Sequence, residues 1–445
     1  MASSYLGVLS YDDNSRVMRH PAQEHNVTVI ETLISHLRNC RTFEQYDNFQ
    51  RELFQLLYFR ELHRSECRRC AARLAKGKAL PSPLPQLPDG ADPNDPETWR
   101  IEDLVLDRIC RQLRAVGDAL AWRASQYDRR YIIALSSNNS PGPMAGKSGL
   151  PHELGTSSDL RSRGSFGLLH DLTNCLRIGD ITEFRSDGSK WLYEIKSNQK
   201  AKSAPQRERM EAAVEAVMSG GELPGRPGNR IITPTVRCRT HLRTFVSGID
   251  ASMKRGIAGT AIADARALTA FSLPTLARQE AANLTPQSPV DFNLERQHAL
   301  EQAGITGVLH YVQAASVTRN HDFVPSVMPF ALFPLPPIQA AFLICDYLVF
   351  SVTFAPERLV TTFQRIGITA DIPLAMANDS LESGDTVVRL TRGTRSISLH
   401  PGALYELLIE CLDLDTWSAA IAEVFDDPNA PPHPVIAFST TRVWS

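Results

Sequence analysis

Two short segments joined by an Asp-Gly turn constrain this chain more than any other feature of its sequence. Residues 178–184 and 190–195 alternate and are rich in β-branched and aromatic side chains, a composition that favours β-strands. Asp187 and Gly188 lie between them, and this pair is a strong signal for a tight turn. The sequence therefore predicts an antiparallel hairpin over residues 178–195.

The length of the turn decides which side chains of the hairpin share a face, because a one-residue slip reverses every side chain. A two-residue loop sets Asp180 opposite Ile195, and the acidic side chains then point apart. A three-residue loop over 186–188, with Gly188 in the left-handed region, sets Asp180 opposite Glu194. We predict the three-residue loop, since only glycine takes its last position without strain.

In this register Asp180, Glu194 and Lys196 converge, because residues two apart on a strand share a face. Two adjacent carboxylates repel each other unless a cation lies between them, and hard oxygen ligands suit Mg²⁺ or Mn²⁺. Such an ion polarises a phosphodiester and activates a water, while a lysine stabilises the negative charge that develops during attack. The pattern therefore indicates metal-dependent phosphodiester hydrolysis.

This arrangement resembles the PD-(D/E)XK nuclease superfamily, which has the restriction-endonuclease-like fold, although Gly179 rather than proline precedes the first acid. The resemblance implies catalytic roles for Asp180, Glu194 and Lys196, and a metal site at Asp180, Glu194 and Ile195. It also implies an Mg²⁺- or Mn²⁺-dependent DNA endonuclease in bacterial restriction or anti-phage defence. An RNA-cleaving toxin with the same site and a nucleic-acid-binding module without catalysis are the alternatives.

The resemblance also implies an additional acid from an upstream helix. The candidates before the hairpin are Glu153, Asp171 and Glu102, and their spacing does not choose between them. After the hairpin, apolar residues recur at helical spacing, which predicts a helix from about Gln206.

Charge is unevenly distributed along the chain. Residues 101–210 contain seventeen Lys and Arg against thirteen Asp and Glu, whereas residues 280–445 contain eight Arg against eighteen acids. A phosphate backbone prefers the basic part. The side chains expected to contact nucleic acid, DNA rather than RNA, are Lys147, Lys200, Lys202, Arg207 and Arg209. The acidic part is expected to regulate the protein, or to assemble it as a homodimer or with a partner protein.

Length and proline content divide the chain into three regions. Six prolines within 78–98 mark a linker after predicted helices at 27–76. The predicted regions are an N-terminal helical region with its linker at 1–98, a nuclease domain at 99–280 and an acidic C-terminal α/β domain at 281–445. The predicted fold class is α/β, with a mixed-sheet restriction-endonuclease-like core that includes a strand at 131–135.

Two other motifs have competing interpretations. The segment 142–148 looks like a phosphate-binding loop, but it is one residue short and Pro151 would break the helix that must follow, so a flexible loop is expected. His63, Cys67 and Cys70 share a helix face that is compatible with zinc, although buried cysteines beside a solvated basic face are the more common outcome.

The chain shows no sequence signal for secretion or membrane insertion. Its eight cysteines are scattered, which argues for reduced thiols rather than a disulfide framework. The first residues lack the basic and apolar regions of a signal peptide, and the most apolar run, 338–354, contains Asp346 and is too short to span a bilayer. A soluble, cytoplasmic protein without membrane contacts is therefore expected.

Overall fold

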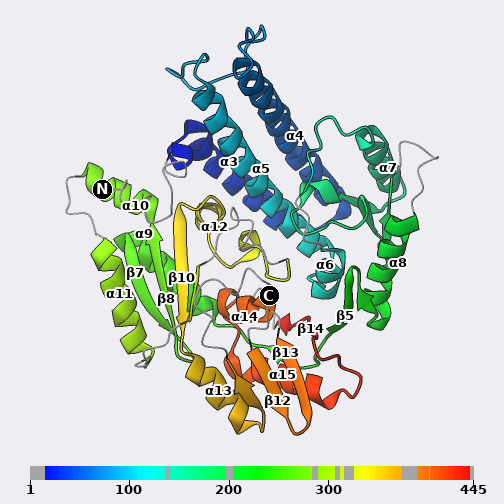
Figure 1. Ribbon diagram of the computed structural model, residues 1–445, viewed down its shortest axis with the longest axis vertical. Coiled ribbons are helices and arrows are strands. Elements are labelled where there is room, and N and C mark those ends of the chain that lie inside the picture. Colours follow the sequence, from blue (N-terminus) through cyan, green and yellow to red (C-terminus); the bar gives the residue numbers. More distant parts are fainter. Residues whose placement is uncertain are drawn as a thin grey trace.

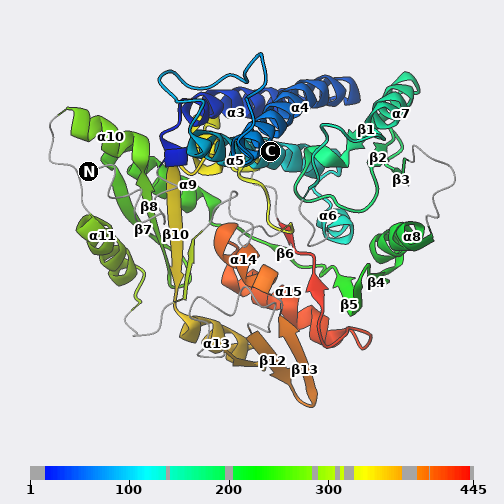
Figure 2. The same cartoon turned by 45° about the horizontal axis from the view of Figure 1, so that its top comes forward.

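The computed structural model describes residues 16–136, 141–195, 204–282, 289–305, 311–314, 325–372, 388–399 and 401–440. Within these ranges the chain is a mixed α/β protein, in which long helices lie above several small sheets (Figure 1; Figure 2). The predicted α/β class is confirmed at this level. No helix in the described part is long and apolar enough to cross a membrane.

Three long helices form the N-terminal part, as the sequence predicts. They are α3 (Pro21–Asn39), α4 (Phe43–Leu74) and α5 (Pro96–Ala124). Thr42 and Gln45 form a reciprocal capping box at the start of α4, and Asp95 caps α5, which begins with a proline. Helix α4 packs along α5, and the proline-rich segment connects them (Figure 1).

A three-stranded antiparallel sheet contains the predicted hairpin. Its strands, in spatial order, are β1 (Phe166–Leu169), β2 (Ile181–Phe184) and β3 (Lys190–Tyr193). Ile181 pairs with Tyr193 at the end of the β2–β3 ladder, and Asp180 and Glu194 lie just outside the paired residues. Gly188 ends the three-residue loop with a φ of +84°. The predicted three-residue loop and the pairing of residues 181–184 with residues 190–193 are therefore confirmed, whereas the predicted pairing of Asp180 with Glu194 lies beyond the paired residues and stays a prediction.

Three shorter helices belong to this part of the chain: α6 (Arg129–Leu135), α7 (Leu150–Ser162), which packs on β1, and α8 (Ala204–Ser219), which follows the hairpin and packs on α6. A 3₁₀ turn, η1 (His170–Leu172), follows β1. The prediction of a strand at 131–135 was wrong, because these residues form most of α6. Their β-branched and aromatic side chains favour a strand locally, but all five are buried in a helix, where tertiary packing outweighs local propensity.

A four-stranded antiparallel sheet lies on the other side of the long helices (Figure 1). Its spatial order is β7 (Ile257–Ile262), β8 (Arg266–Ser272), β10 (Leu348–Phe354) and β9 (Tyr311–Ala314). The neighbouring helices are α9 (Leu242–Arg255), α10 (Leu273–Ala281) and α11 (Pro289–Gln302), of which α9 and α11 pack on the sheet. Strands from both sides of residue 280 therefore share one sheet.

The C-terminal part returns to the region of the hairpin. It begins with η2 (Phe330–Leu332), α12 (Pro337–Ile344) and α13 (Pro356–Arg365), and continues through β11 (Thr369–Asp371), β12 (Val388–Arg392), β13 (Arg395–Leu399), α14 (Pro401–Ile409) and α15 (Leu414–Asp426). Its last strands, β14 (Val435–Ile436) and β15 (Ser439–Thr440), pair in parallel with β5 (Arg226–Ile232) and β6 (Arg237–Cys238). The short strand β4 (Glu222–Leu223) lies on the other side of β5.

A buried ion triad joins α6 to α14. The guanidinium of Arg129 contacts Glu406, and it lies 2.8 Å from Glu410 Oε2. The three side chains are at most 5% exposed. Burial raises the pKa of Glu406 to about 8; Arg129 opposes this shift and Glu410 adds to it. Two carboxylates thus share one guanidinium in the core.

Candidate functional site

Four charged side chains converge beside the hairpin. Glu153 lies in the first turn of α7, Asp171 just after β1, and Asp180 just before β2. Lys147, from the loop before α7, lies between them. Its Nζ is 2.8 Å from Glu153 Oε1, 2.8 Å from Asp171 Oδ2 and 3.3 Å from Asp180 Oδ1. We call these four residues the acid cluster.

Strand pairing and helix packing bring the three acids together. His170 N donates a hydrogen bond to Asp180 O at 2.9 Å, which holds Asp171 and Asp180 at the same end of the β1–β2 pair. Helix α7 packs on β1 at Gly167, where an added Cβ would lie 2.9 Å from a side chain of the helix. The glycine therefore allows the close approach that places Glu153 over this end of the sheet.

Two hydrogen bonds tie Asp180 to the end of the hairpin. Its main-chain N donates to Tyr193 O at 2.8 Å, and its Oδ2 accepts from Ile195 N at 2.7 Å. The other carboxylate oxygen, Oδ1, faces Lys147. Glu194 directly follows β3 and is half-buried. The hairpin thus fixes the orientation of one acid of the cluster.

The main chain of Ile195 reaches the same space. A Cβ built on Gly149 would lie 3.3 Å from Glu153 Oε1 and 4.0 Å from the carbonyl oxygen of Ile195. A side chain at position 149 would therefore enter the space beside these two oxygens. Ile195, a predicted metal ligand, contacts the acid cluster through its main-chain N, which donates to Asp180 Oδ2.

Negative charge exceeds positive charge within the acid cluster. Glu153 is buried, and its Oε1 makes no hydrogen bond within the described structure, although Lys147 lies at ion-pair distance. Burial raises the pKa of Glu153, and Lys147 opposes this shift. Burial lowers the pKa of Lys147, but its contacts with Asp171 and Glu153 outweigh burial and raise that pKa above the usual lysine value. Three carboxylates face a single ammonium.

The ligand types suit a hard divalent cation, although the three carboxylates are not a group whose donor atoms all lie within 4.8 Å of one another, as those of His241, Asp264 and Asp413 do. Carboxylate and carbonyl oxygens are ligand types that Mg²⁺ and Mn²⁺ prefer. The buried Glu153 Oε1 has the ammonium of Lys147 at 2.8 Å, and a divalent ion at this position would replace that contact. The ammonium of Lys147 contacts the same carboxylates that such a cation would bind, so the two cations exclude each other.

A buried chain of polar side chains supports the cluster from behind. Thr182 Oγ1 contacts the hydroxyl of Tyr131 and lies 2.7 Å from His170 Nε2. The other ring nitrogen, Nδ1, lies 3.0 Å from Gly179 O. Burial and the charge of Arg177 lower the pKa of His170 to about 4, so the ring is neutral at neutral pH. These hydrogen-bonded side chains hold the turn that leads into Asp180.

Glu102 does not belong to this site, and its prediction as an additional acid was wrong. Glu102 Oε1 lies 2.7 Å from His20 Nε2, where α5 faces the start of α3. Spacing along the sequence does not show toward which neighbour Glu102 points, because that depends on how α5 packs. The other two candidates, Glu153 and Asp171, both lie in the acid cluster.

The predicted nucleic-acid contacts lie in different environments. Arg207 and Arg209 are exposed on α8, and Arg207 Nε lies 2.8 Å from Glu211 Oε1. Lys147 is inside the acid cluster rather than on the surface beside it. Residues outside the described ranges are Lys196, Lys200 and Lys202. The sequence predicted Lys147 only as a DNA contact, and its position between the three acids was missed. Its separation from Glu153 by six residues was the only feature of the sequence that could have indicated this position.

The cysteines considered for zinc have the environment of core residues. Cys67 and Cys70 are buried against Trp99, and burial raises the pKa of the Cys67 thiol to about 12. His63 Nε2 lies 3.0 Å from Gln86 O instead. These contacts agree with the alternative that the sequence favoured.

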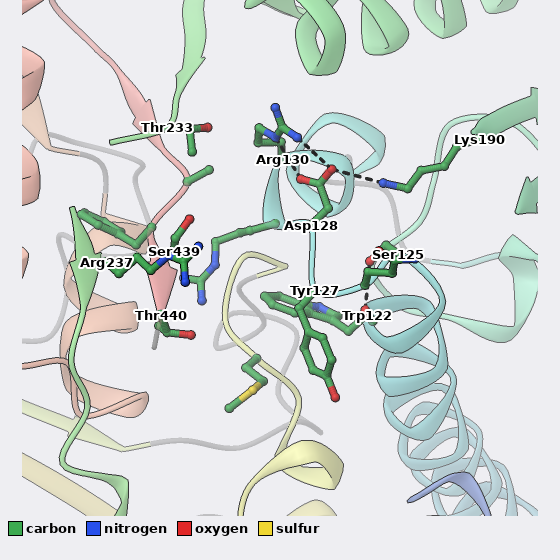
Figure 3. Close-up of a pocket in the computed structure, with 15 residues that line it drawn as sticks. Trp122, Ser125, Tyr127, Asp128, Arg130, Lys190, Thr233, Arg237, Ser439 and Thr440 are labelled. Carbon is green, nitrogen blue, oxygen red and sulfur yellow. Dashed lines mark hydrogen bonds and ion pairs between the residues drawn. The ribbon is translucent and has the colours of Figure 1, made fainter. Parts of the chain in front are cut away.

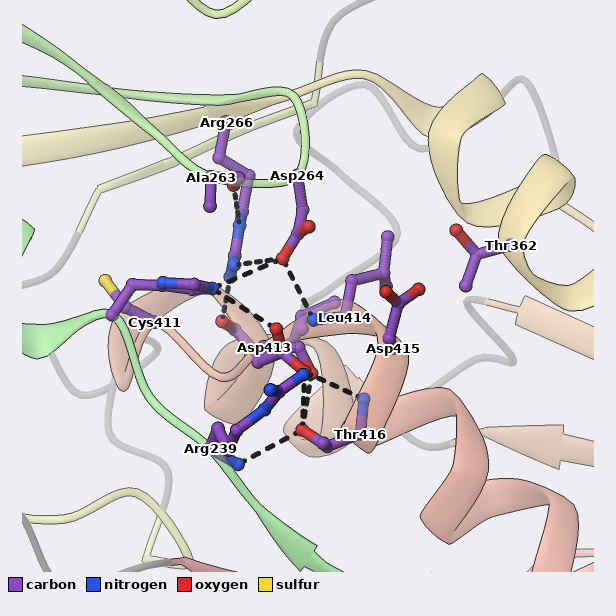
Figure 4. A network of polar contacts seen from close by, with 12 residues as sticks. Arg239, Ala263, Asp264, Arg266, Thr362, Cys411, Asp413, Leu414, Asp415 and Thr416 are labelled. Carbon is purple, nitrogen blue, oxygen red and sulfur yellow. Dashed lines mark hydrogen bonds and ion pairs between the residues drawn. The ribbon is translucent and has the colours of Figure 1, made fainter.

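A second group of potential metal ligands lies far from the hairpin. Donor atoms of His241, Asp264 and Asp413 all lie within 4.8 Å of one another, the closest such group in the described part of the chain. However, Arg266 lies 3.2 Å from Asp264 and Arg239 lies 3.1 Å from Asp413 (Figure 4). We call these five residues the His241 network. Its two arginines already neutralise its two carboxylates.

Comparisons with known proteins supply no relative from which a function could be transferred. No family model, no curated protein and no solved structure matches the chain. The function must therefore be argued from the geometry of the acid cluster and the hairpin.

Proposed function

We propose that the protein is a nuclease that hydrolyses phosphodiester bonds with Mg²⁺ or Mn²⁺. One observation carries this proposal: three carboxylates from separate elements converge on one cation beside the hairpin. Glu153, Asp171 and Asp180 hold that cation position, and Ile195 N donates to Asp180 Oδ2. The resemblance to PD-(D/E)XK nucleases agrees with this arrangement, since Glu153 lies on an upstream helix and α8 follows the hairpin.

The proposed roles follow from the position of each group. A bound divalent ion supplies Lewis-acid polarisation of the phosphodiester and a more acidic water. Asp180 is oriented by Ile195 N, so its second oxygen remains directed into the cluster. Glu153, Asp171 and Asp180 would hold the ion in place of Lys147, whose ammonium would then be available to a substrate phosphate. Lys196 retains the role expected from the resemblance, stabilisation of charge that develops during attack.

Nucleic acid is proposed to approach across the hairpin and α8. Arg207 and Arg209 present charge on the exposed surface of this helix. Replacing both with alanine should reduce the slope of log affinity against log salt by about one to two units, because each phosphate contact releases counterions. An unchanged slope would move the substrate path away from α8. The exposed Arg389 on β12 provides a control variant.

Incubation of the purified protein with plasmid, linear DNA, single-stranded DNA and RNA tests the activity. Cleavage should require Mg²⁺ or Mn²⁺ and should stop in EDTA. Glu194→Ala removes the second acid that the resemblance implies, and it should abolish cleavage and weaken ion binding while the protein stays folded. Full cleavage in EDTA would refute the proposal, and full cleavage by Glu194→Ala would remove that residue from the site. The four substrates also separate a DNA endonuclease from an RNA-cleaving enzyme.

A further inference from the structure

A cavity of about 760 Å³ lies between the helical part and the C-terminal strands. Its wall combines the turn between α5 and α6, Lys190 of β3, the segment around β6, and residues 437–440 at the end of the chain (Figure 3). This volume lies in the range typical of small-molecule sites. None of its residues belongs to the acid cluster.

The charges around the cavity favour an anion. Arg130 and Lys190 stand on one side, and Arg237 stands on another (Figure 3). The one carboxylate in the wall, Asp128, lies 3.0 Å from Arg130 Nε and 3.2 Å from Lys190 Nζ. Arg129 also lines the cavity, but its guanidinium is directed to the buried triad. Two positive charges therefore remain in excess around the open space.

Hydroxyl groups lie beside these cations. Arg237 stands directly opposite Ser439 in the parallel pair of β6 and β15, and Thr440 follows (Figure 3). Thr233 lines the same side. Arginine with neighbouring hydroxyl donors is a common arrangement for binding phosphate oxygens.

An aromatic side chain completes the wall at a strained position. Tyr127 has a φ of +62° and follows Gln126, which has a φ of +58°. Its main-chain N donates to Trp122 O at 2.7 Å, which closes the end of α5. Glycine would adopt this backbone more easily, so the tyrosine is held here at a conformational cost. The side chain is 37% exposed at the cavity.

We propose that this cavity binds a nucleoside phosphate. The cations and hydroxyls receive the phosphate groups, and the ring of Tyr127 provides a stacking surface for the base. The binding does not require the acid cluster, so it stands independently of the proposed nuclease activity.

Isothermal titration calorimetry of the full chain with ADP, inorganic phosphate and adenosine tests this assignment. EDTA is present throughout, so that a metal-bridged contact at the acid cluster makes no contribution. ADP should bind more tightly than phosphate or adenosine alone. Arg237→Ala should weaken ADP binding about tenfold or more, since a charged hydrogen-bonding group is lost. Arg389→Ala, at an exposed arginine of β12 outside the cavity, should have no effect.

Tyr127→Gly separates the role of the ring from the fold. Glycine suits the positive φ, so the end of α5 should remain intact while ADP binding weakens and phosphate binding stays unchanged. Thermal unfolding of both variants verifies that they are folded, and Lys190→Gln provides a further variant from the opposite wall. The proposal is overturned if ADP does not bind, if adenosine binds as tightly as ADP, or if Arg237→Ala leaves ADP binding unchanged.

Discussion

The acid cluster and the His241 network both gather carboxylates around a positive side chain, yet they differ in charge balance. In the His241 network the donor atoms are closer together, but Arg239 and Arg266 pair with its acids. In the acid cluster three carboxylates share one ammonium, that of Lys147. We therefore propose the acid cluster rather than the His241 network for a divalent cation, because a cation is attracted to negative charge that no neighbouring cation compensates.

The two regions also shift the pKa of a carboxyl group in opposite directions. Burial raises the pKa of Asp264, but hydrogen bonds from His241 and Leu414 N and the charge of Arg266 outweigh it and lower that pKa to about 2. The pKa of Glu153 shifts in the opposite direction, because burial exceeds the contribution of Lys147. The His241 network therefore stabilises the charged form of Asp264, whereas the environment of Glu153 disfavours its charged form.

The largest contrast is expected between Asp180→Asn and Asp413→Asn. Asp180→Asn should reduce cleavage by about 10³-fold or more, because it removes charge from the proposed metal position. Asp413→Asn should leave cleavage unchanged, since that residue caps α15 and pairs with Arg239. Cleavage rates at saturating Mn²⁺ provide the measurement. Equal losses in the two variants would remove the functional distinction between the regions.

Lys147→Met should increase the affinity for Mn²⁺ about tenfold or more, because the competing ammonium is removed from three carboxylates. Calorimetric titration without nucleic acid measures this directly. Arg239→Met is the matched variant in the His241 network, where Arg266 remains, and it should create no Mn²⁺ site. Weaker Mn²⁺ binding by Lys147→Met would show that the lysine organises the carboxylates instead of competing for them.

The smallest effect concerns stability in acid. The pKa of Asp264 is about 2 in the folded chain, against an ordinary value of 3.8, so its contribution is present above about pH 4 and is lost as pH falls toward 2. Asp264→Asn should therefore lose about 1 kcal/mol of stability near neutral pH, after allowance for solvent screening, and little at pH 2. Urea unfolding at several pH values measures the difference. A loss that is independent of pH would assign the effect to packing.

The hairpin was predictable because its register depends on a few adjacent residues. The position of Gly188 and the alternation of the flanking strands were sufficient to set the pairing of residues 181–184 with residues 190–193. The long helices were predictable for a similar reason, since their caps and apolar spacing are local. Glu153 could be named as a candidate, but only the packing of α7 on Gly167 distinguishes it from Glu102.

Features that depend on distant segments escaped prediction. His241 contacts Asp413, which is separated from it by more than a third of the sequence, and no local sequence pattern predicts that contact. The helix over 131–135 is a second example, because its composition favours a strand, whereas its packing in the core stabilises a helix. Lys147 was recognised only as a basic loop residue, since its carboxylate partners come from three different elements.

The buried pairing of Arg129 with Glu406 and Glu410 has a consequence for how the chain is made. During synthesis α6 leaves the ribosome long before α14, so the guanidinium must stay hydrated until residues 406–410 arrive. Burying it earlier would leave an uncompensated charge, at a cost of about 3–5 kcal/mol. We therefore expect a fragment of residues 99–280 to be trapped in a partly folded state, and maturation of the hairpin region to wait for the end of translation.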